Sequence, residues 1–214
     1  MNDPRGVWTK VDGVTRPEDA VAAVDAGFSA VGLIFAESTR RLTLAQAQRI
    51  RDAIGDDAIV FGVFDGSSPG AVVRAAAALR LGGVQFPAEL SLDGYPPLDD
   101  DVIVLRTVRV RDASSLDGID ALDCTAVHLD AYVEGALGGT GVVAPWDVIE
   151  AHRPSRLFVV SGGLRPDNVG EAVRRLRPDG VDVSSGVESA PGIKDHALLR
   201  AFVEAARSGR GSAV

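Results

Sequence analysis

The sequence predicts a single α/β domain in which eight parallel strands alternate with helices and close into a barrel. Apolar runs such as Ala30–Phe35 have no polar alternation, as expected for parallel strands that are covered on both faces. Segments with helical spacing or capping residues follow most of these runs. A chain of 214 residues is long enough for one barrel and short for two domains. The predicted fold is therefore one (βα)₈ barrel of the TIM type.

Eight strands are expected from the apolar runs and from the small or polar residues that end them. The first ends at Asp12-Gly13 and the last at Ser184-Ser185-Gly186, so both lead into turns that glycine favours. The expected strands are Val7–Asp12, Ala30–Phe35, Ala58–Phe64, Gly83–Phe86, Val102–Val108, Ala126–Asp130, Leu157–Ser161 and Val181–Ser184.

Helices are expected between most of these strands. The first is predicted to be capped by Thr15, with Pro17 in its first turn and Glu18 three residues after the cap, and to end at Gly27. The others are expected at Leu44–Ala53, Pro69–Leu79, Ala113–Ala121, Pro145–His152, after Pro166-Asp167-Asn168, and at Asp195–Arg207.

The connection between the fourth and fifth strands is the exception. Pro96-Pro97 and the acidic run Asp99–Asp101 leave little room for a helix in this stretch. We therefore expect the fourth helix to be short or absent. Since no linker divides the chain, residues 1–207 are assigned to the barrel and residues 208–214 to a disordered tail.

Composition and charge exclude several classes of protein. A net charge of −8 argues against nucleic acid and anionic membranes as partners, because both favour a basic surface. No apolar run is long enough to span a bilayer, and the amino terminus has no apolar export segment. The single cysteine, Cys124, excludes an internal disulfide and suits the reducing cytoplasm. The histidines share no metal-binding spacing with it, so no metal site is predicted, and we interpret His128 as a core residue.

Two glycine turns follow the last two strands. Gly162-Gly163 ends the seventh strand, and Ser184-Ser185-Gly186 ends the eighth. Small residues there let backbone amides approach a ligand closely, and this pair of turns is a favoured phosphate site in (βα)₈ barrels. Either turn alone is more simply explained as a structural turn. Together they predict a phosphate-binding site.

Two aspartates end strands on opposite sides of the barrel mouth. Asp12 ends the first strand and Asp130 the sixth, and strand ends of this kind carry the chemistry of such barrels. A base and an acid that flank one substrate suit a proton-transfer enzyme, provided that their surroundings separate their pKa values. Each aspartate alone has an alternative role as a helix cap or turn residue.

Other polar residues at strand ends complete the candidate site. Arg41, in the loop after the second strand, could bind a carboxylate through two hydrogen bonds, although an exposed arginine is the simpler explanation from local sequence. Gly138-Gly139-Thr140-Gly141 is interpreted as a mobile lid. The polar residues at the expected strand ends are Asp12, Arg40, Arg41, Asp65, Gln85, either Arg106 or Arg109, and Asp130.

Several of these segments resemble the phosphoribosylanthranilate isomerase family of tryptophan biosynthesis. The resemblance covers nearly the whole chain. Its motifs are Lys10-Val11-Asp12-Gly13, Phe35-Ala36-Glu37-Ser38-Thr39-Arg40-Arg41, Leu129-Asp130-Ala131, Gly138-Gly139-Thr140-Gly141, Ser161-Gly162-Gly163-Leu164-Arg165-Pro166-Asp167-Asn168, and Val181-Asp182-Val183-Ser184-Ser185-Gly186-Val187-Glu188.

The resemblance implies a cofactor-free Amadori rearrangement of N-(5′-phosphoribosyl)anthranilate or a close aryl-amine analogue. It implies Asp130 as general acid, a base at Asp12, and Arg41 as the group that holds the anthranilate carboxylate. Gln85 and the two turns (Gly162, Gly163, Ser184, Ser185 and Gly186) are then substrate-binding, and the protein is expected to be cytoplasmic and a monomer or homodimer.

The chain departs from the family at two positions. The family's base is a cysteine where this chain has Asp12, and its Gln-Leu-His-Gly segment is here Gln85-Phe86-Pro87-Ala88. The first departure leaves open a barrel that binds phosphate without turnover, and the second a paralogue that acts on a different aminobenzoate riboside. An isomerase that also accepts the histidine-pathway substrate would need a second phosphate site, for which Gly66-Ser67-Ser68 is a weak candidate.

Overall fold

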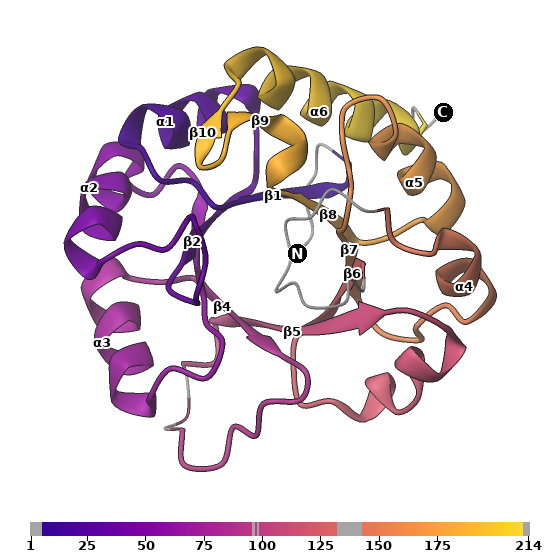
Figure 1. The fold of residues 1–214 in the computed structure, drawn as a ribbon, viewed down its shortest axis with the longest axis horizontal. Helices are drawn as coiled ribbons and strands as arrows, with labels where there is room; N and C mark the ends of the chain where they lie inside the picture. Colours follow the sequence, from indigo (N-terminus) through magenta and orange to yellow (C-terminus); the bar gives the residue numbers. More distant parts are fainter. Residues whose placement is uncertain (1–5, 96, 98, 132–142, 212–214) are drawn as a thin grey trace.

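The computed structural model describes residues 6–95, 97, 99–131 and 143–211 of the chain. Eight parallel strands hydrogen-bond in sequence order and close into a barrel, with β8 paired to β1 (Figure 1). The predicted fold is therefore confirmed. The strands are β1 (Trp8–Asp12), β2 (Ala30–Ile34), β3 (Ile59–Val63), β4 (Gly83–Pro87), β5 (Ile103–Val110), β6 (Ala126–Ala131), β7 (Phe158–Val160) and β8 (Gly180–Val183).

The α-helices surround the strands (Figure 1). They are α1 (Pro17–Ala26), α2 (Leu44–Ile54), α3 (Pro69–Leu79), α4 (Trp146–Ala151), α5 (Val169–Leu176) and α6 (His196–Gly209). The described part of the β4–β5 connection contains no helix, as expected from its prolines. The helix expected at Ala113–Ala121 is instead two 3₁₀ turns, η1 (Ala113–Leu116) and η2 (Ile119–Ala121). Gly118 separates them because its φ of +74° lies in the left-handed region, which interrupts a helix.

The cap expected at Thr15 is not formed. The N-cap of α1 is Arg16, which makes no side-chain capping bond. Thr15 Oγ1 instead donates to the carbonyl of Gly192 at 2.6 Å, in the turn between β9 (Glu188–Ala190) and β10 (Ile193–Lys194). A tertiary contact has therefore replaced the local one, and it joins the start of α1 to the β9–β10 hairpin.

The helix α6 is longer than expected. It includes Ser208 and Gly209, which the sequence placed in a disordered tail. Gly209 packs so closely on Gly170 of α5 that an added Cβ would lie 2.5 Å from the Gly170 carbonyl oxygen. This close packing explains why the last turn is helical.

The barrel interior is layered from the amino to the carboxyl ends of its strands. Alternate residues of a strand point inward, so Trp8, Lys10 and Asp12 lie at successive heights. The lowest layer is apolar, and there Trp8 meets the ring of Phe61 edge-on at 5.7 Å between centroids. The members of this apolar cluster are Trp8, Ala30, Phe61, Leu105, Ala126 and Val159. Polar side chains lie above this layer, next to the open end of the barrel. No helix within the described ranges combines the length and apolar character that crossing a bilayer requires.

Candidate functional site

A cavity of about 350 Å³ opens at the carboxyl ends of the strands. Asp12 and Asp130 both line it, so the two acids predicted from opposite sides of the barrel face one space. Of the other predicted residues, Gln85, Gly162, Gly163, Ser184, Ser185 and Gly186 also line it, whereas Arg41 does not.

Asp12 ends β1 and is almost completely buried, with 7% of its surface exposed. Its carboxylate lies directly over Gly32 of β2, where an added Cβ would be 1.6 Å from Oδ1. The same oxygen accepts a hydrogen bond from Lys10 Nζ. Burial and then repulsion from Asp182 raise the pKa of Asp12 to about 6, although Lys10 acts in the opposite direction. A carboxylate with this pKa is a stronger base than an exposed aspartate and is still ionised at neutral pH.

Lys10 and Asp182 form a buried ion pair at the floor of the cavity, which Asp182 lines. Lys10 Nζ lies 3.0 Å from Asp182 Oδ2 and donates to Gln85 Oε1 at 2.9 Å. His128 Nε2 lies 2.8 Å from the same Asp182 oxygen, so His128 is paired in the core, in line with its interpretation from the sequence. The prediction overlooked Lys10 and Asp182 as site residues. A charged residue two positions before a strand-end candidate, inside an apolar strand, is the pattern that could have identified them.

Asp130 is the penultimate residue of β6, is half-buried and lines the cavity. Its Oδ1 accepts the backbone N–H of Ala131 at 2.9 Å, which fixes the carboxylate at the strand end. Gly162, with φ of +81°, lies so close that an added Cβ would be 2.9 Å from this oxygen. The glycine turn after β7 therefore makes room for the acid as well as forming part of the cavity wall.

Arg40, and not its neighbour, is the arginine of the β2 loop that reaches the cavity. Arg41, the arginine expected from the sequence, does not line the cavity: its backbone N–H donates to the Ser38 carbonyl, and its side chain is exposed to solvent. Leu42, the next residue, is buried, so the backbone directs the Arg41 side chain to solvent and the Leu42 side chain to the core. Arg40 crosses Gly13, where an added Cβ would lie 2.4 Å from the Arg40 Cδ.

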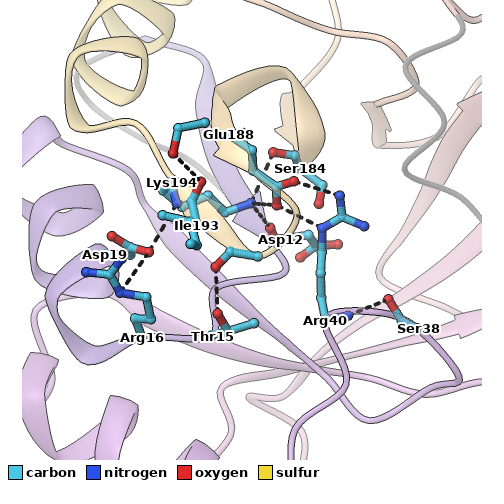
Figure 2. A network of polar contacts seen from close by, with 12 residues as sticks. Asp12, Thr15, Arg16, Asp19, Ser38, Arg40, Ser184, Glu188, Ile193 and Lys194 are labelled. Carbon is cyan, nitrogen blue, oxygen red and sulfur yellow. Dashed lines mark hydrogen bonds and ion pairs between the residues drawn. The ribbon is translucent and has the colours of Figure 1, made fainter.

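Glu188 and Lys194 hold Arg40 in place (Figure 2). Arg40 Nε and Nη2 donate to the two carboxylate oxygens of Glu188 at 2.8 and 2.6 Å. Lys194 Nζ donates to Glu188 at 2.8 Å and to the backbone carbonyls of Asp12 and Ser184 at 2.7 and 3.0 Å. Burial alone would raise the pKa of Glu188, but these two cations outweigh it and lower the pKa. Within this cluster two basic groups face one carboxylate, which locally favours an anionic ligand.

The two predicted turns lie in direct contact at the same end of the cavity. Gly162 and Gly163 have φ of +81° and +62°, which favours glycine at both positions. Asn168 braces this turn by donating from Nδ2 to the Gly163 carbonyl at 2.9 Å. An added Cβ at Gly186 would lie 1.9 Å from the carbonyl oxygen of Leu164, so the two turns approach each other over a glycine. This geometry supports the predicted phosphate-binding role.

Replacing Gly186 with alanine is expected to raise KM for a phosphorylated substrate by roughly 10- to 100-fold, the effect of losing a charge-assisted hydrogen bond. The new methyl group meets backbone, which has little freedom to yield, and so pushes the two turns apart. Steady-state kinetics and inhibition by inorganic phosphate would measure the change. Ser189→Ala, at an exposed position of β9, is the matched control. Unchanged KM and unchanged inhibition by phosphate in Gly186→Ala would contradict this role.

Aromatic residues line the cavity near the ends of β3 and β4. The Phe64 ring stacks on Phe35 at 5.2 Å and on Phe86 at 5.7 Å between centroids. Phe64, Phe86 and Pro87 line the cavity. Arg106 is buried beneath the β4 loop, where its Nη2 donates to the carbonyl of Pro87 at 3.1 Å and to that of Ala88 at 2.8 Å. This end of the cavity is thus apolar and firmly supported, as a binding site for an aromatic ring requires.

Two further expectations concern a metal site and a glycine lid. The residues that the structure describes contain no group of three or more His, Cys, Asp or Glu side chains that could hold a metal ion. The expected lid, Gly138-Gly139-Thr140-Gly141, lies outside the described residues.

Comparison with known families and sequences gives consistent matches. Residues 9–205 match the model of the family described as N-(5′-phosphoribosyl)anthranilate (PRA) isomerase. The chain is 40% identical over 205 residues to N-(5′-phosphoribosyl)anthranilate isomerase of Geobacter sulfurreducens, an alignment that covers 94% of this chain and 98% of the relative. It is also 40% identical over 202 residues to the enzyme of that name from Rubrobacter xylanophilus, with coverage of 93% and 98%.

Solved structures agree with this likeness. Phosphoribosylanthranilate isomerase from Thermotoga maritima superimposes with a TM-score of 0.84 at 30% identity, and 94% of this chain and 99% of that chain are covered. A structure of such an enzyme in complex with reduced 1-(o-carboxyphenylamino)-1-deoxyribulose 5-phosphate has a TM-score of 0.81 at 30% identity, with the same coverage. That ligand carries a phosphate and an aromatic carboxylate.

Proposed function

Since this chain belongs to the phosphoribosylanthranilate isomerase family, whose members are isomerases of tryptophan biosynthesis, we propose that it converts N-(5′-phosphoribosyl)anthranilate into the corresponding aminoketose. Asp12 is the general base and Asp130 the general acid. The observation that carries this assignment is the cavity itself, in which a buried carboxylate with a pKa of about 6 and a second carboxylate face one space beside two glycine turns. No cofactor is required.

The reaction is a sequence of proton transfers within one molecule. Asp130 protonates the furanose ring oxygen, the bond from that oxygen to C1′ breaks, and the nitrogen lone pair forms a protonated imine with C1′. Asp12 then removes the proton from C2′, the freed electron pair forms the C1′=C2′ double bond of an enolamine, and the C=N electron pair returns to nitrogen. Tautomerisation of this enol gives the ketone. The base and the acid can act on one bound substrate because they approach the same space from different strands.

The remaining contacts position the substrate. The turns at Gly162-Gly163 and Ser184–Gly186 bind the phosphate, and Arg40 binds the ring carboxylate in place of the residue first expected. Gln85 lines the cavity and accepts from Lys10, so it supports the base. The enzyme acts in the cytoplasm as a monomer or homodimer.

The purified protein tests this proposal directly. N-(5′-phosphoribosyl)anthranilate is supplied, and its conversion is followed by the change in anthranilate fluorescence. The gene is also expressed in a tryptophan auxotroph that lacks this isomerase. Turnover together with restored growth supports the proposal. Phosphate binding without turnover would show instead a barrel that has lost its activity.

A second candidate is a specialised isomerase for a different aminobenzoate riboside. It is favoured by the aromatic end of the cavity, where Phe86 and Pro87 differ from the family pattern and Arg106 fixes the loop behind them. Comparing kcat/KM for anthranilate and hydroxylated anthranilate ribosides separates the two. A preference of tenfold or more for a hydroxylated ring would favour the specialised enzyme.

Arg40→Ala is expected to raise KM for the carboxylated substrate by roughly 10- to 100-fold, because a hydrogen-bonded charge pair contributes about 1.5–3 kcal/mol. Arg41→Ala, one residue away, is the matched control and should change KM little, since its side chain is exposed outside the cavity. Steady-state kinetics of both variants measure the contrast. Equal effects of the two substitutions would remove Arg40 from the proposed site.

A further inference from the structure

A layer of buried polar side chains forms the floor of the cavity, above the apolar base of the barrel, and Gln85, His128 and Asp182 of this layer line the cavity. Lys10 is completely buried, and Gln85, His128 and Asp182 are between 3% and 6% exposed. Charged groups are costly to bury unless they are paired, and replacing such a set with apolar residues is often neutral or stabilising. A charged layer directly below the proposed base therefore points to a role other than stability.

Lys10 uses all of its hydrogen-bonding capacity within this layer. Its three N–H donors match three partners: Asp12 Oδ1, Asp182 Oδ2 at 3.0 Å and Gln85 Oε1 at 2.9 Å. These partners come from three different strands, β1, β8 and β4. Lys10 is therefore fixed in position, and it fixes the Asp12 carboxylate in turn.

His128 completes the layer on the far side of Asp182. The ionised carboxylate of Asp182 can only accept, so His128 Nε2, which lies 2.8 Å away, must carry the hydrogen. In a neutral imidazole, Nδ1 then accepts, and Thr107 Oγ1 lies 3.3 Å from it. Lys10 and His128 therefore both donate to carboxylates of this layer, and Lys10 also donates to the Gln85 amide oxygen.

The carboxylates of Asp12 and Asp182 differ in the number of hydrogen bonds that they accept. Within the described part of the chain, Asp182 Oδ2 receives hydrogen bonds from both Lys10 and His128, whereas the Asp12 side chain receives one, from Lys10. Burial alone would raise the pKa of Asp182, but Lys10 and His128 outweigh it and hold the pKa at about 2. One ammonium and two carboxylates leave the layer with a net charge of −1 when His128 is neutral. One added proton brings this net charge to zero. Of the two carboxylates that could accept the proton, Asp12 accepts fewer hydrogen bonds.

We propose that Lys10, Asp182 and His128 are positioning residues that hold Asp12 in place and make it, rather than Asp182, the carboxylate that takes up the substrate proton. The proposal deepens the proposed function and rests on Asp12 as the base. The other charged groups nearby act from above: Lys194 bonds the Asp12 backbone carbonyl, Arg40 lines the cavity wall with Glu188 at its guanidinium, and Asp130 lines the opposite wall.

Two substitutions should move the protonation of Asp12 in opposite directions. Asp182→Asn removes a like charge, so the acid limb of the kcat/KM profile is expected to move roughly one unit toward lower pH. Lys10→Met removes an opposite charge, so the limb should move toward higher pH. If these residues only stabilised the fold, the two substitutions would not shift the acid limb in opposite directions. Shifts in the same direction, or no shift in either variant, would overturn the proposal.

The role of His128 is tested by removing its hydrogen bond to Asp182. His128→Leu removes the donor to Asp182 and is expected to lower kcat at least tenfold with little change in KM, since His128 does not hold the phosphate or the ring carboxylate. His128→Gln keeps a donor amide and should recover much of the loss. Equal activity of the Leu and Gln variants would overturn the role of the hydrogen bond. Neither leucine nor glutamine carries a charge, so neither variant adds a charged side chain to the core.

A measurement without substrate separates this inference from the proposed function. The carboxyl carbon of Asp12 is titrated by ¹³C NMR in the labelled wild type, and its resonance is assigned by its absence in Asp12→Asn. Titration midpoints in Asp182→Asn and His128→Leu that equal the wild-type midpoint would overturn the inference even in an active enzyme. Shifted midpoints in a protein that does not turn over N-(5′-phosphoribosyl)anthranilate would support the layer's role while the proposed function fails. If Asp182→Asn does not fold, His128→Leu and its Gln counterpart decide the outcome.

Discussion

Replacing Asp12 with asparagine is expected to lower kcat by roughly 10²- to 10⁴-fold, the usual contribution of a positioned general base. Asparagine keeps the size of the side chain but cannot accept the C2′ proton. The wild-type rate should also depend on pH through this group. Since Asp12 must be ionised to act, kcat/KM is expected to be high above its pKa of about 6 and to fall as the pH drops through that value. The acid limb should be absent from the residual activity of Asp12→Asn.

Asp12→Cys provides the informative control for this prediction. The phosphoribosylanthranilate isomerase family has cysteine at this position, and a thiol has an ordinary pKa of about 8.5. The cysteine variant is therefore expected to retain more activity than asparagine, with its acid limb at higher pH than in the wild type. Full activity of Asp12→Asn would show that another group is the base.

Replacing Gly32 with alanine is expected to lower kcat nearly as much as removing the base, roughly 10²-fold or more. The new Cβ would lie 1.6 Å from Asp12 Oδ1, so the carboxylate must swing away and lose its bond from Lys10. The fold should tolerate the change better than the reaction does, because the displaced atom belongs to the end of a side chain. Thermal unfolding and kcat measured on the same sample would show this difference.

Gly70→Ala serves as the matched substitution. Gly70 lies in α3, where an added Cβ comes no closer than 3.4 Å to a neighbouring atom, and alanine favours a helix. Its kcat should equal that of the wild type. If Gly32→Ala also kept the wild-type kcat, the position of the Asp12 carboxylate seen here would not be the one that reacts.

The parts of the site that the sequence could predict are those set by local pattern. Asp12, Asp130 and the glycine turns follow directly from the ends of apolar strands, and a closed parallel barrel brings strand ends together. Arg40 and Arg41 could not be distinguished in this way, because a turn at Ser38 and the burial of Leu42 decide which side chain faces inward.

Tertiary contacts explain the other differences. Lys10 pairs with Gln85 and Asp182, which lie 75 and 172 residues along the chain, so no local window shows the pair. Thr15 has the sequence context of a helix cap, but the carbonyl of Gly192 offers it a partner that only the folded chain supplies. The 3₁₀ turns after β5 reflect a left-handed glycine, Gly118, inside a segment with helical composition.

The contacts of Lys194 have a consequence for how this chain is made. Its ammonium group ties the end of β1 to the end of β8 and also reaches Glu188, the partner of Arg40. A nascent polypeptide that is still short of residue 194 already contains the proposed base, the proposed acid and both phosphate turns, yet it lacks the cation that bonds the ends of β1 and β8. During synthesis, the reacting side chains are therefore made before Lys194. A chain truncated within the β9–β10 hairpin would contain the proposed catalytic and phosphate-binding residues but would lack the contacts of Lys194 that hold β1 and β8 together.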